Sequence, residues 1–229
     1  MSRDREQGDA LRTPSAASGA APGRELSRLL EHPAIWRGRS AARIRTLPTG
    51  FPALDESLPG GGWPRAGLIE ILPACFGVGE LPLLLPALAA VTRRPQARWC
   101  AWVAPPLQPF APALAQYGVG LERVLVVQTR RKDTGGKSAL WAFEQTLRSG
   151  ACDIVLGWLR NALPRQIRRL HLAAERGATL GVLFRPPEAA RNSSPAALRV
   201  VVEPAARGAR VTLLKSRGGA RGTIELSLS

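Results

Sequence analysis

Residues 49–71 read TGFPALDESLPGGGWPRAGLIEI, in which a glycine- and proline-rich approach leads into an apolar strand at Leu68–Leu72. From Gly67 onward, short apolar runs alternate with helical stretches, which is the pattern of a parallel sheet covered on both faces. The strands that follow are expected at Trp99–Ala104, Val124–Gln128, Ile154–Trp158 and Thr179–Phe184. The helices between them are expected at residues 80–91, 109–117, 138–149 and 164–176. An α/β fold with a mostly parallel sheet flanked by helices is therefore predicted.

The two ends of the chain differ from this pattern. Near the C-terminus, apolar runs are separated by glycine and arginine turns without an intervening helix, at Leu198–Val202, Arg210–Leu214 and Thr223–Leu228. They predict an antiparallel C-terminal meander. Residues 1–23 are small and charged without apolar periodicity, so we expect a disordered tail. Residues 24–47 are expected to form a helix and a basic linker, and residues 48–229 a single domain.

Composition narrows the function classes. The net charge is +15, with 32 basic and 17 acidic residues, which favours a polyanionic partner or simply reflects an arginine-rich, generally basic surface. The N-terminus has no apolar signal region, and the longest apolar run, Leu81–Val91, is short and interrupted by prolines. We therefore expect a cytoplasmic protein with no membrane contact.

The cysteines and histidines offer no metal or catalytic pattern. Cys75, Cys100 and Cys152 lie far apart in apolar sequence without CxxC spacing, so they are expected to be buried, reduced thiols. His32 and His171 are the only histidines, and neither belongs to a recognisable Cys/His arrangement. We expect no metal, no cofactor and no catalytic residues.

The stretch at residues 49–71 closely resembles the segment of RecA that leads into its phosphate-binding loop. The shared elements include Thr49-Gly50, Leu54-Asp55, the glycines at 61–62 and Glu70-Ile71. This resemblance implies a RecA-like P-loop core that continues, more weakly, to about residue 215. It would place a GxxxxGK[ST] loop directly after the first strand, where backbone N–H groups and a lysine hold nucleotide phosphates.

The residues required for nucleotide hydrolysis are replaced at the corresponding positions. In the vestigial loop, made of Gly77, Val78, Gly79, Glu80 and Leu81, Glu80 stands in place of the lysine and Leu81 in place of the hydroxyl residue. Pro106 falls at the position of the glutamate that activates water, and Trp158 at that of the magnesium-binding aspartate. The resemblance thus implies a non-catalytic protein, and a weakly active ATPase is the least favoured alternative.

Together with the entry HPAIWRG (residues 32–38) and the closing SPAALRVVVE and LLKSRGG runs, the core is similar to the ImuA family of SulA-like proteins. The similarity implies an adaptor in SOS-induced, error-prone translesion DNA synthesis. The implied partners are an ImuB-type inactive Y-family polymerase, an error-prone DnaE-type polymerase and RecA, with non-specific DNA contact. The alternative is a SulA-type cell division inhibitor that binds FtsZ.

Candidate contact residues follow from position and residue type. The resemblance to RecA implies DNA contacts in the loops after the fourth and fifth strands, where Arg160, Arg185 and Arg191 are the candidates, and the basic C-terminal meander adds Arg217 and Arg221. Ile35, Trp36 and Trp63 are the candidate partner contacts, because tryptophan in a loop often fills a pocket of a partner. Core packing is expected for the remaining tryptophans, which are Trp99, Trp102, Trp141 and Trp158.

Overall fold

The computed structural model describes residues 45–75, 77, 79–129, 136–216 and 221–228, all of which belong to one compact unit spanning residues 42–229. The expected disordered tail of residues 1–23 lies outside the described residues. So do Ile35 and Trp36 in the expected helix and linker. A short strand β1 (Thr46–Leu47) pairs antiparallel with β2 (Trp63–Pro64), which brings the described part of the expected linker onto the domain. The helix α2 (Pro52–Ser57) lies between these strands in the sequence.

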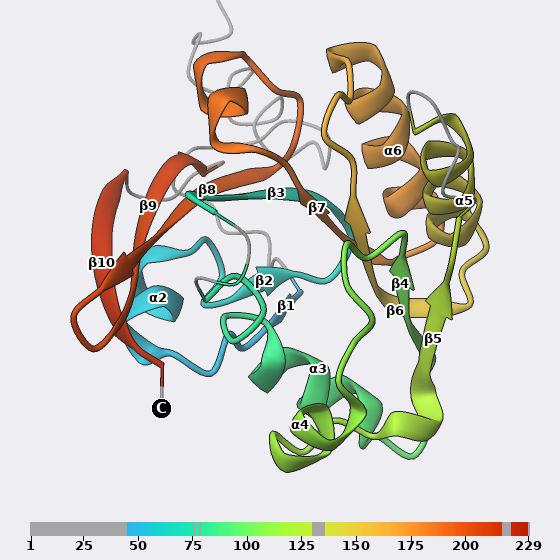
Figure 1. Ribbon diagram of the computed structural model, residues 1–229, viewed down its shortest axis with the longest axis horizontal. Helices are drawn as coiled ribbons and strands as arrows, with labels where there is room; N and C mark the ends of the chain where they lie inside the picture. The colour runs from blue at the N-terminus through green and yellow to red at the C-terminus, as the bar shows by residue number, and fades with distance from the viewer. Residues whose placement is uncertain (1–44, 76, 78, 130–135, 217–220, 229) are drawn as a thin grey trace, which may run out of the picture. The chain divides into compact units, whose positions relative to one another are not determined.

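The main sheet has eight strands in the order β10-β9-β8-β3-β7-β6-β4-β5 (Figure 1). The strands from β3 to β8 pair in parallel wherever they are neighbours, and β9 and β10 are antiparallel. The bounds are β3 (Gly67–Pro73), β4 (Trp99–Val103), β5 (Val124–Val127), β6 (Cys152–Trp158), β7 (Leu180–Phe184), β8 (Leu198–Ala205), β9 (Gly208–Ser216) and β10 (Gly222–Ser227). The predicted mostly parallel sheet with an antiparallel C-terminal meander is confirmed.

Helices cover both faces of this sheet, and each face has its own core. On one face, α3 (Leu85–Thr92) and α4 (Ala111–Gln116) pack against alternate strand residues such as Ile69 and Ile71. On the other, α5 (Lys137–Arg148) and α6 (Pro164–Arg176) pack against residues such as Leu68. Figure 1 shows α5 and α6 side by side at one flank of the sheet. Since β3 lies between β7 and β8, all of its residues are buried.

Local sequence explains where the helices begin. In α6, Pro164 occupies the first helical position, and the Gln166 side chain accepts the Leu163 N–H at 2.8 Å. The helix expected from residue 80 begins only at Leu85, because the chain first makes turns around Pro82, which lacks the N–H that a helix interior needs. No helix in the described part of the chain is both long and apolar enough to cross a membrane.

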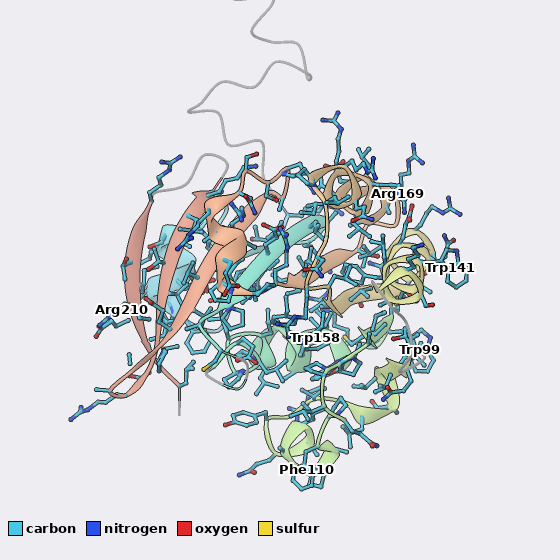
Figure 2. All side chains as sticks on the ribbon, turned by 45° about the horizontal axis from the view of Figure 1, so that its top comes forward. Trp99, Phe110, Trp141, Trp158, Arg169 and Arg210 are labelled. Carbon is cyan, nitrogen blue, oxygen red and sulfur yellow. The ribbon has the colours of Figure 1, made fainter. Side chains whose placement is uncertain are left out.

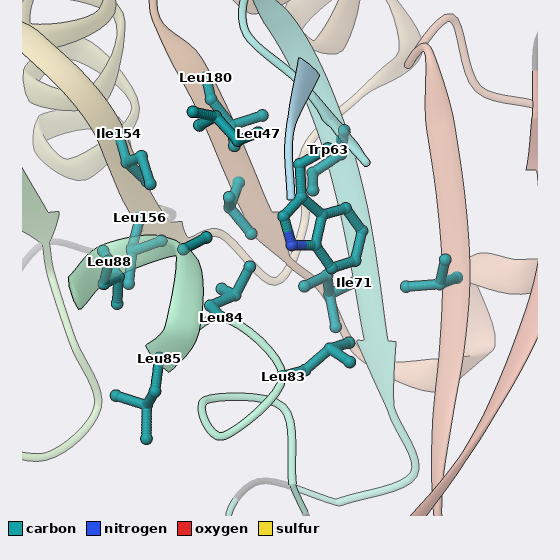
Figure 3. Close-up of a cluster of buried hydrophobic side chains, with 14 of the residues drawn as sticks. Leu47, Trp63, Ile71, Leu83, Leu84, Leu85, Leu88, Ile154, Leu156 and Leu180 are labelled. Carbon is teal, nitrogen blue, oxygen red and sulfur yellow. The ribbon is translucent and has the colours of Figure 1, made fainter. Parts of the chain in front are cut away.

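Three predictions about individual tryptophans are wrong. Trp63 is fully buried and lies among Leu47, Ile71 and Leu83 in the core on the α3 side, so it is not a partner contact (Figure 3). The side chain of Trp141 is 64% exposed because Ala139, Phe143 and Leu147 define the buried face of α5 and residue 141 points the other way. Trp99 is 40% exposed at the beginning of β4.

Candidate interaction site at the carboxyl end of the sheet

The loop after β3 contains its own anion. Glu80 is buried, and its Oε1 accepts the backbone N–H of Gly77 at 2.7 Å. Gly77 and Gly79 have φ of +91° and +110°, the left-handed conformations that let such a loop turn. In a phosphate-binding loop, donors of this kind meet phosphate oxygens. Here the Glu80 carboxylate accepts one such N–H group, that of Gly77, and repels a second anion. Leu81 packs against the core, and Val78 lies outside the described residues.

An aromatic layer lies where parallel strands end. The Trp158 ring stacks on Phe184 with centroids 4.6 Å apart and is tilted against Trp102 at 5.9 Å. These residues belong to β6, β7 and β4, so the layer closes the carboxyl end of the sheet with hydrocarbon where the RecA resemblance expects a carboxylate for magnesium. Among the described residues, no group of three His, Cys, Asp or Glu side chains is arranged to hold a metal ion. Pro106, at the expected position of the catalytic glutamate, is exposed.

A buried ion triad organises the adjoining loops. The fully buried Glu70 of β3 lies opposite Arg199 of β8 and receives hydrogen bonds from Arg199 Nε and from Arg185 Nη1, the latter at 3.0 Å. Arg185 also donates to the Ala162 carbonyl at 2.9 Å. Arg199 donates to the carbonyls of Ala189 and Asn192 at 2.7 and 2.8 Å. The triad thereby connects the loop after β6 and the loop after β7 to the central strand β3.

Arg185 was predicted to contact DNA, and that prediction is wrong for the structure as it stands. Its side chain is only 7% exposed, and the guanidinium is directed into the protein towards Glu70 and Ala162. A loop arginine looks free in the sequence because its partner is 115 positions away. Burying the Glu70 carboxylate without a counter-ion would be too costly. Arg185 and Arg199 are therefore directed inward, where they pair with it.

A groove of about 730 Å³ separates the two fastened loops. Polar side chains line much of it, among them Arg160, Asn161, Asn192 and Ser193. Arg160 is exposed, as is Arg191 at the end of the short 3₁₀ helix η2 (Pro187–Arg191). Since ligands of open α/β sheets collect at strand carboxyl ends, this groove is a candidate polar binding site.

Arg221, the other predicted arginine in the described part of the C-terminal meander, does not line this groove. Arg221 is exposed just before β10, the strand at the far edge of the sheet from β5, and Arg217 lies outside the described residues. On α6, four arginines are exposed, namely Arg165, Arg168, Arg169 and Arg176. The basic character is therefore distributed over several surfaces.

The cysteines divide into two kinds. Cys100 and Cys152 are buried, as predicted, on neighbouring strands, and desolvation raises the pKa of Cys100 to about 12 and that of Cys152 to about 11. Cys75 is exposed, because it follows the end of β3 and lies beyond the cover of the helices, so the prediction of a buried thiol is wrong there.

Sequence reasoning missed an exposed apolar surface around α4 and β5. Its members are large hydrophobic side chains with 36–81% exposure: Leu107, Phe110, Tyr117, Leu121, Leu125 and Val126. Figure 2 shows Phe110 projecting from this end of the molecule. One signal could have revealed it, namely that no charged residue occurs from Trp99 to Leu121 in a chain with 21% charged residues.

The comparisons with known proteins agree on one family. A family model described as cell division inhibitor SulA matches residues 78–181. The cell division inhibitor SulA of Edwardsiella piscicida is 35% identical over 125 residues, which are 55% of this chain and 71% of that protein. That of Photorhabdus laumondii is 31% identical over 104 residues, covering 45% of this chain but only 56% of the relative.

RecA and solved structures also match. Protein RecA of Prochlorococcus marinus is 37% identical over 117 residues, which are 51% of this chain and 29% of RecA. The crystal structure of SulA from Pseudomonas aeruginosa matches with 27% identity and a TM-score of 0.43, covering 52% of this chain and 97% of the solved chain.

Proposed function

This chain belongs to the SulA family of cell division inhibitors, and from that premise we propose that it arrests division after DNA damage by binding FtsZ. The observation that carries the proposal is the 35% identity with the Edwardsiella piscicida cell division inhibitor, 71% of which is covered. Division inhibition was the alternative in the sequence analysis. The family match supports it better than the translesion role, which the similarity to the ImuA family favours.

Inhibition would be stoichiometric binding that needs no nucleotide turnover. In the loop after β3, Gly77 N–H already donates to the Glu80 carboxylate, and Trp158 stands where magnesium would need an acidic ligand. Phosphoryl transfer depends on positioned positive charge, a metal ion and an oriented water. We therefore expect the protein to bind FtsZ equally well with and without ATP and magnesium, and equilibrium binding of labelled ATP to remain undetectable at micromolar concentrations.

The test is induced expression in the source bacterium combined with assembly of purified FtsZ. We expect undivided filamentous cells, and a loss of FtsZ assembly that scales with the molar ratio of the two proteins. Normal division despite high levels of folded protein, together with unaffected FtsZ assembly, would refute the proposal. Micromolar ATP binding that is abolished by mutation of Gly77 and Gly79 would instead contradict the description of the loop as self-occupied.

The translesion adaptor remains a second candidate because the RecA-like stretch at residues 49–71 lies outside the segment that the family model matches. This role predicts that the protein co-elutes with an ImuB-type polymerase and, through it, with a DnaE-type polymerase. Deleting the gene would lower damage-induced mutagenesis without changing filamentation. The division role predicts the reverse, so the two phenotypes separate the candidates.

DNA contact belongs to this second candidate. With Arg185 used in the triad, the exposed Arg160 and Arg191 remain as its main candidates. Phosphate contacts without base reading would be non-specific and lose affinity with salt, with a log–log slope of about −0.9 per phosphate on duplex DNA. Binding that survives replacement of both arginines by alanine would exclude this surface.

A further inference from the structure

The strand β5 forms one end of the main sheet, and its outer edge pairs with no strand among the described residues. On its inner side it pairs in parallel with β4, and the Val127 carbonyl accepts the Ala104 N–H at 2.9 Å. Peptide groups of successive residues point to opposite sides of a strand. Those of Val126 therefore point outward, where they can pair with an incoming backbone.

Apart from being only four residues long, the described strand β5 carries none of the devices by which proteins usually protect an open edge. Natural edges carry lysines, prolines, bulges or inward charges that block pairing. The residues of β5 are all valine or leucine, with Leu125 44% and Val126 36% exposed, and its pairing with β4 shows no register shift. Leu107 and Phe110, which are 81% and 70% exposed, flank Gln108 and Pro109, which line a groove together with Val124 and Val126 of β5. Exposed apolar side chains gathered in this way mark an interaction site.

A groove beside the edge can receive side chains of an added strand. It has a volume of about 490 Å³ and lies between β5 and α4. Its apolar wall includes Leu114, Leu121, Val124 and Val126. In strand addition, backbone hydrogen bonds supply affinity, and pockets for alternate side chains supply selectivity. The combination of open edge and groove therefore fits an extended peptide with apolar residues at every second position.

Charge decides which kind of molecule would occupy this edge. Because no charged residue occurs from Trp99 to Leu121, α4 and the segment before it carry no cations to neutralise nucleic-acid phosphates. A second copy of the chain would carry the same net charge of +15 and be repelled. Cations outnumber anions at the rim, where the Arg93 guanidinium lies against Gly118 beyond α4, Arg123 directly precedes β5, and Glu122 is the acidic neighbour. The surroundings thus favour acidic residues at the ends of the bound segment.

We propose that the outer edge of β5 binds an extended segment of a protein partner, apolar at alternate positions and flanked by acidic residues, as an added strand. The inference rests on the proposed function only for the partner's identity, which would be FtsZ. The surface itself is defined by β5, α4 and the groove between them.

The experiment uses Val126→Pro in the full chain, with Val126→Thr as the matched control. Proline removes the outward N–H and is tolerated at edge positions, whereas threonine keeps both the N–H and the β-branched shape. Two probes are used: purified FtsZ of the source bacterium, and a synthetic nonapeptide, Asp-Glu-Val-Thr-Val-Thr-Val-Glu-Asp. A version of this peptide with lysine in place of its acidic residues tests the charge argument.

We expect Val126→Pro to weaken binding of both probes at least about tenfold and Val126→Thr to change it less than about threefold. Hydrogen exchange at the Val126 amide of the unmodified protein should slow when either probe is added, a readout that does not depend on any variant folding. The lysine peptide should bind at least about tenfold more weakly than the acidic one.

The outcomes separate this inference from the proposed function. If FtsZ binds but neither Val126→Pro nor Val126 exchange responds, the division role stands and the edge-strand inference is wrong. If FtsZ does not bind while the acidic peptide binds and protects Val126, the edge is a docking site and the choice of FtsZ is wrong. If neither probe binds, both the edge-strand inference and the choice of FtsZ are wrong. If the lysine peptide binds as tightly as the acidic one, the inference that the bound segment has acidic flanks is wrong.

Discussion

Replacing Glu70 with glutamine is expected to lower the free energy of unfolding by about 3–5 kcal/mol, the usual consequence of removing one member of a buried ion pair. The side chain is fully buried, and Arg185 Nη1 lies 3.0 Å from one of its oxygens. Unit charges at that distance attract by about 5 kcal/mol at an effective dielectric constant of about 20, which desolvation of the ions partly offsets. Glutamine keeps the shape but leaves two buried guanidinium groups without a counter-ion.

Urea unfolding followed by circular dichroism measures this loss. With a slope of about 2–3 kcal/mol per M, the midpoint should fall by about 1–2.5 M. The matched control is Glu225→Gln, which makes the same chemical change in an arginine pair whose side chains are 47% and 67% exposed, and it should stay within about 0.5 kcal/mol. A loss below about 1 kcal/mol for Glu70→Gln would refute the buried triad.

The triad also has a local consequence that separates it from ordinary core packing. Arg185 and Arg199 hold the carbonyls of Ala162 and Asn192, so they restrain both walls of the groove. In Glu70→Gln, amide exchange in these two loops should accelerate more than exchange in β9 and β10. Uniform acceleration across the sheet would mean that the triad stabilises the domain without positioning the loops.

Three further outcomes are expected. Trp63→Ala should cost about 3–5 kcal/mol in thermal or urea unfolding, whereas Trp63→Phe should cost clearly less, because the buried indole N–H has no partner among the described residues; equal losses would contradict this. Ala178→Gly should raise stability by about 0.5–1 kcal/mol, since residue 178 has φ of +46°, and a lower melting temperature would contradict the strain. Burial raises the pKa of Cys100 from 9.0 to about 12 and that of Cys152 from 9.0 to about 11, so folding favours the protonated thiols. The free energy of unfolding should therefore be unaffected by these thiols below pH 9 and should fall as the pH rises towards 11–12. A thiol reagent at pH 8 should therefore label only Cys75 in the native protein, and fast labelling of all the cysteines would contradict the burial.

The class of fold could be predicted from the sequence alone. Strand and helix periods alternate from Gly67 onward, and the helix-free end predicts the meander, because both patterns depend on neighbours a few positions apart. The presence of Glu80 where a phosphate-binding loop has its lysine could also be predicted from the sequence. What the sequence did not show is that the Glu80 carboxylate accepts the Gly77 N–H and so occupies the loop.

Tertiary structure alone decided which residues are available for binding. Arg185 and Trp63 resemble free loop residues in the sequence, yet one pairs with Glu70 at a separation of 115 positions and the other fills the core on the α3 side. The four apolar residues of β5 read like a central strand, but the strand order places β5 at the sheet's end and leaves its outer side open. Local patterns record which side chains avoid water. They do not record which strands become neighbours, because that depends on how the crossover helices pack on the two faces of the whole sheet.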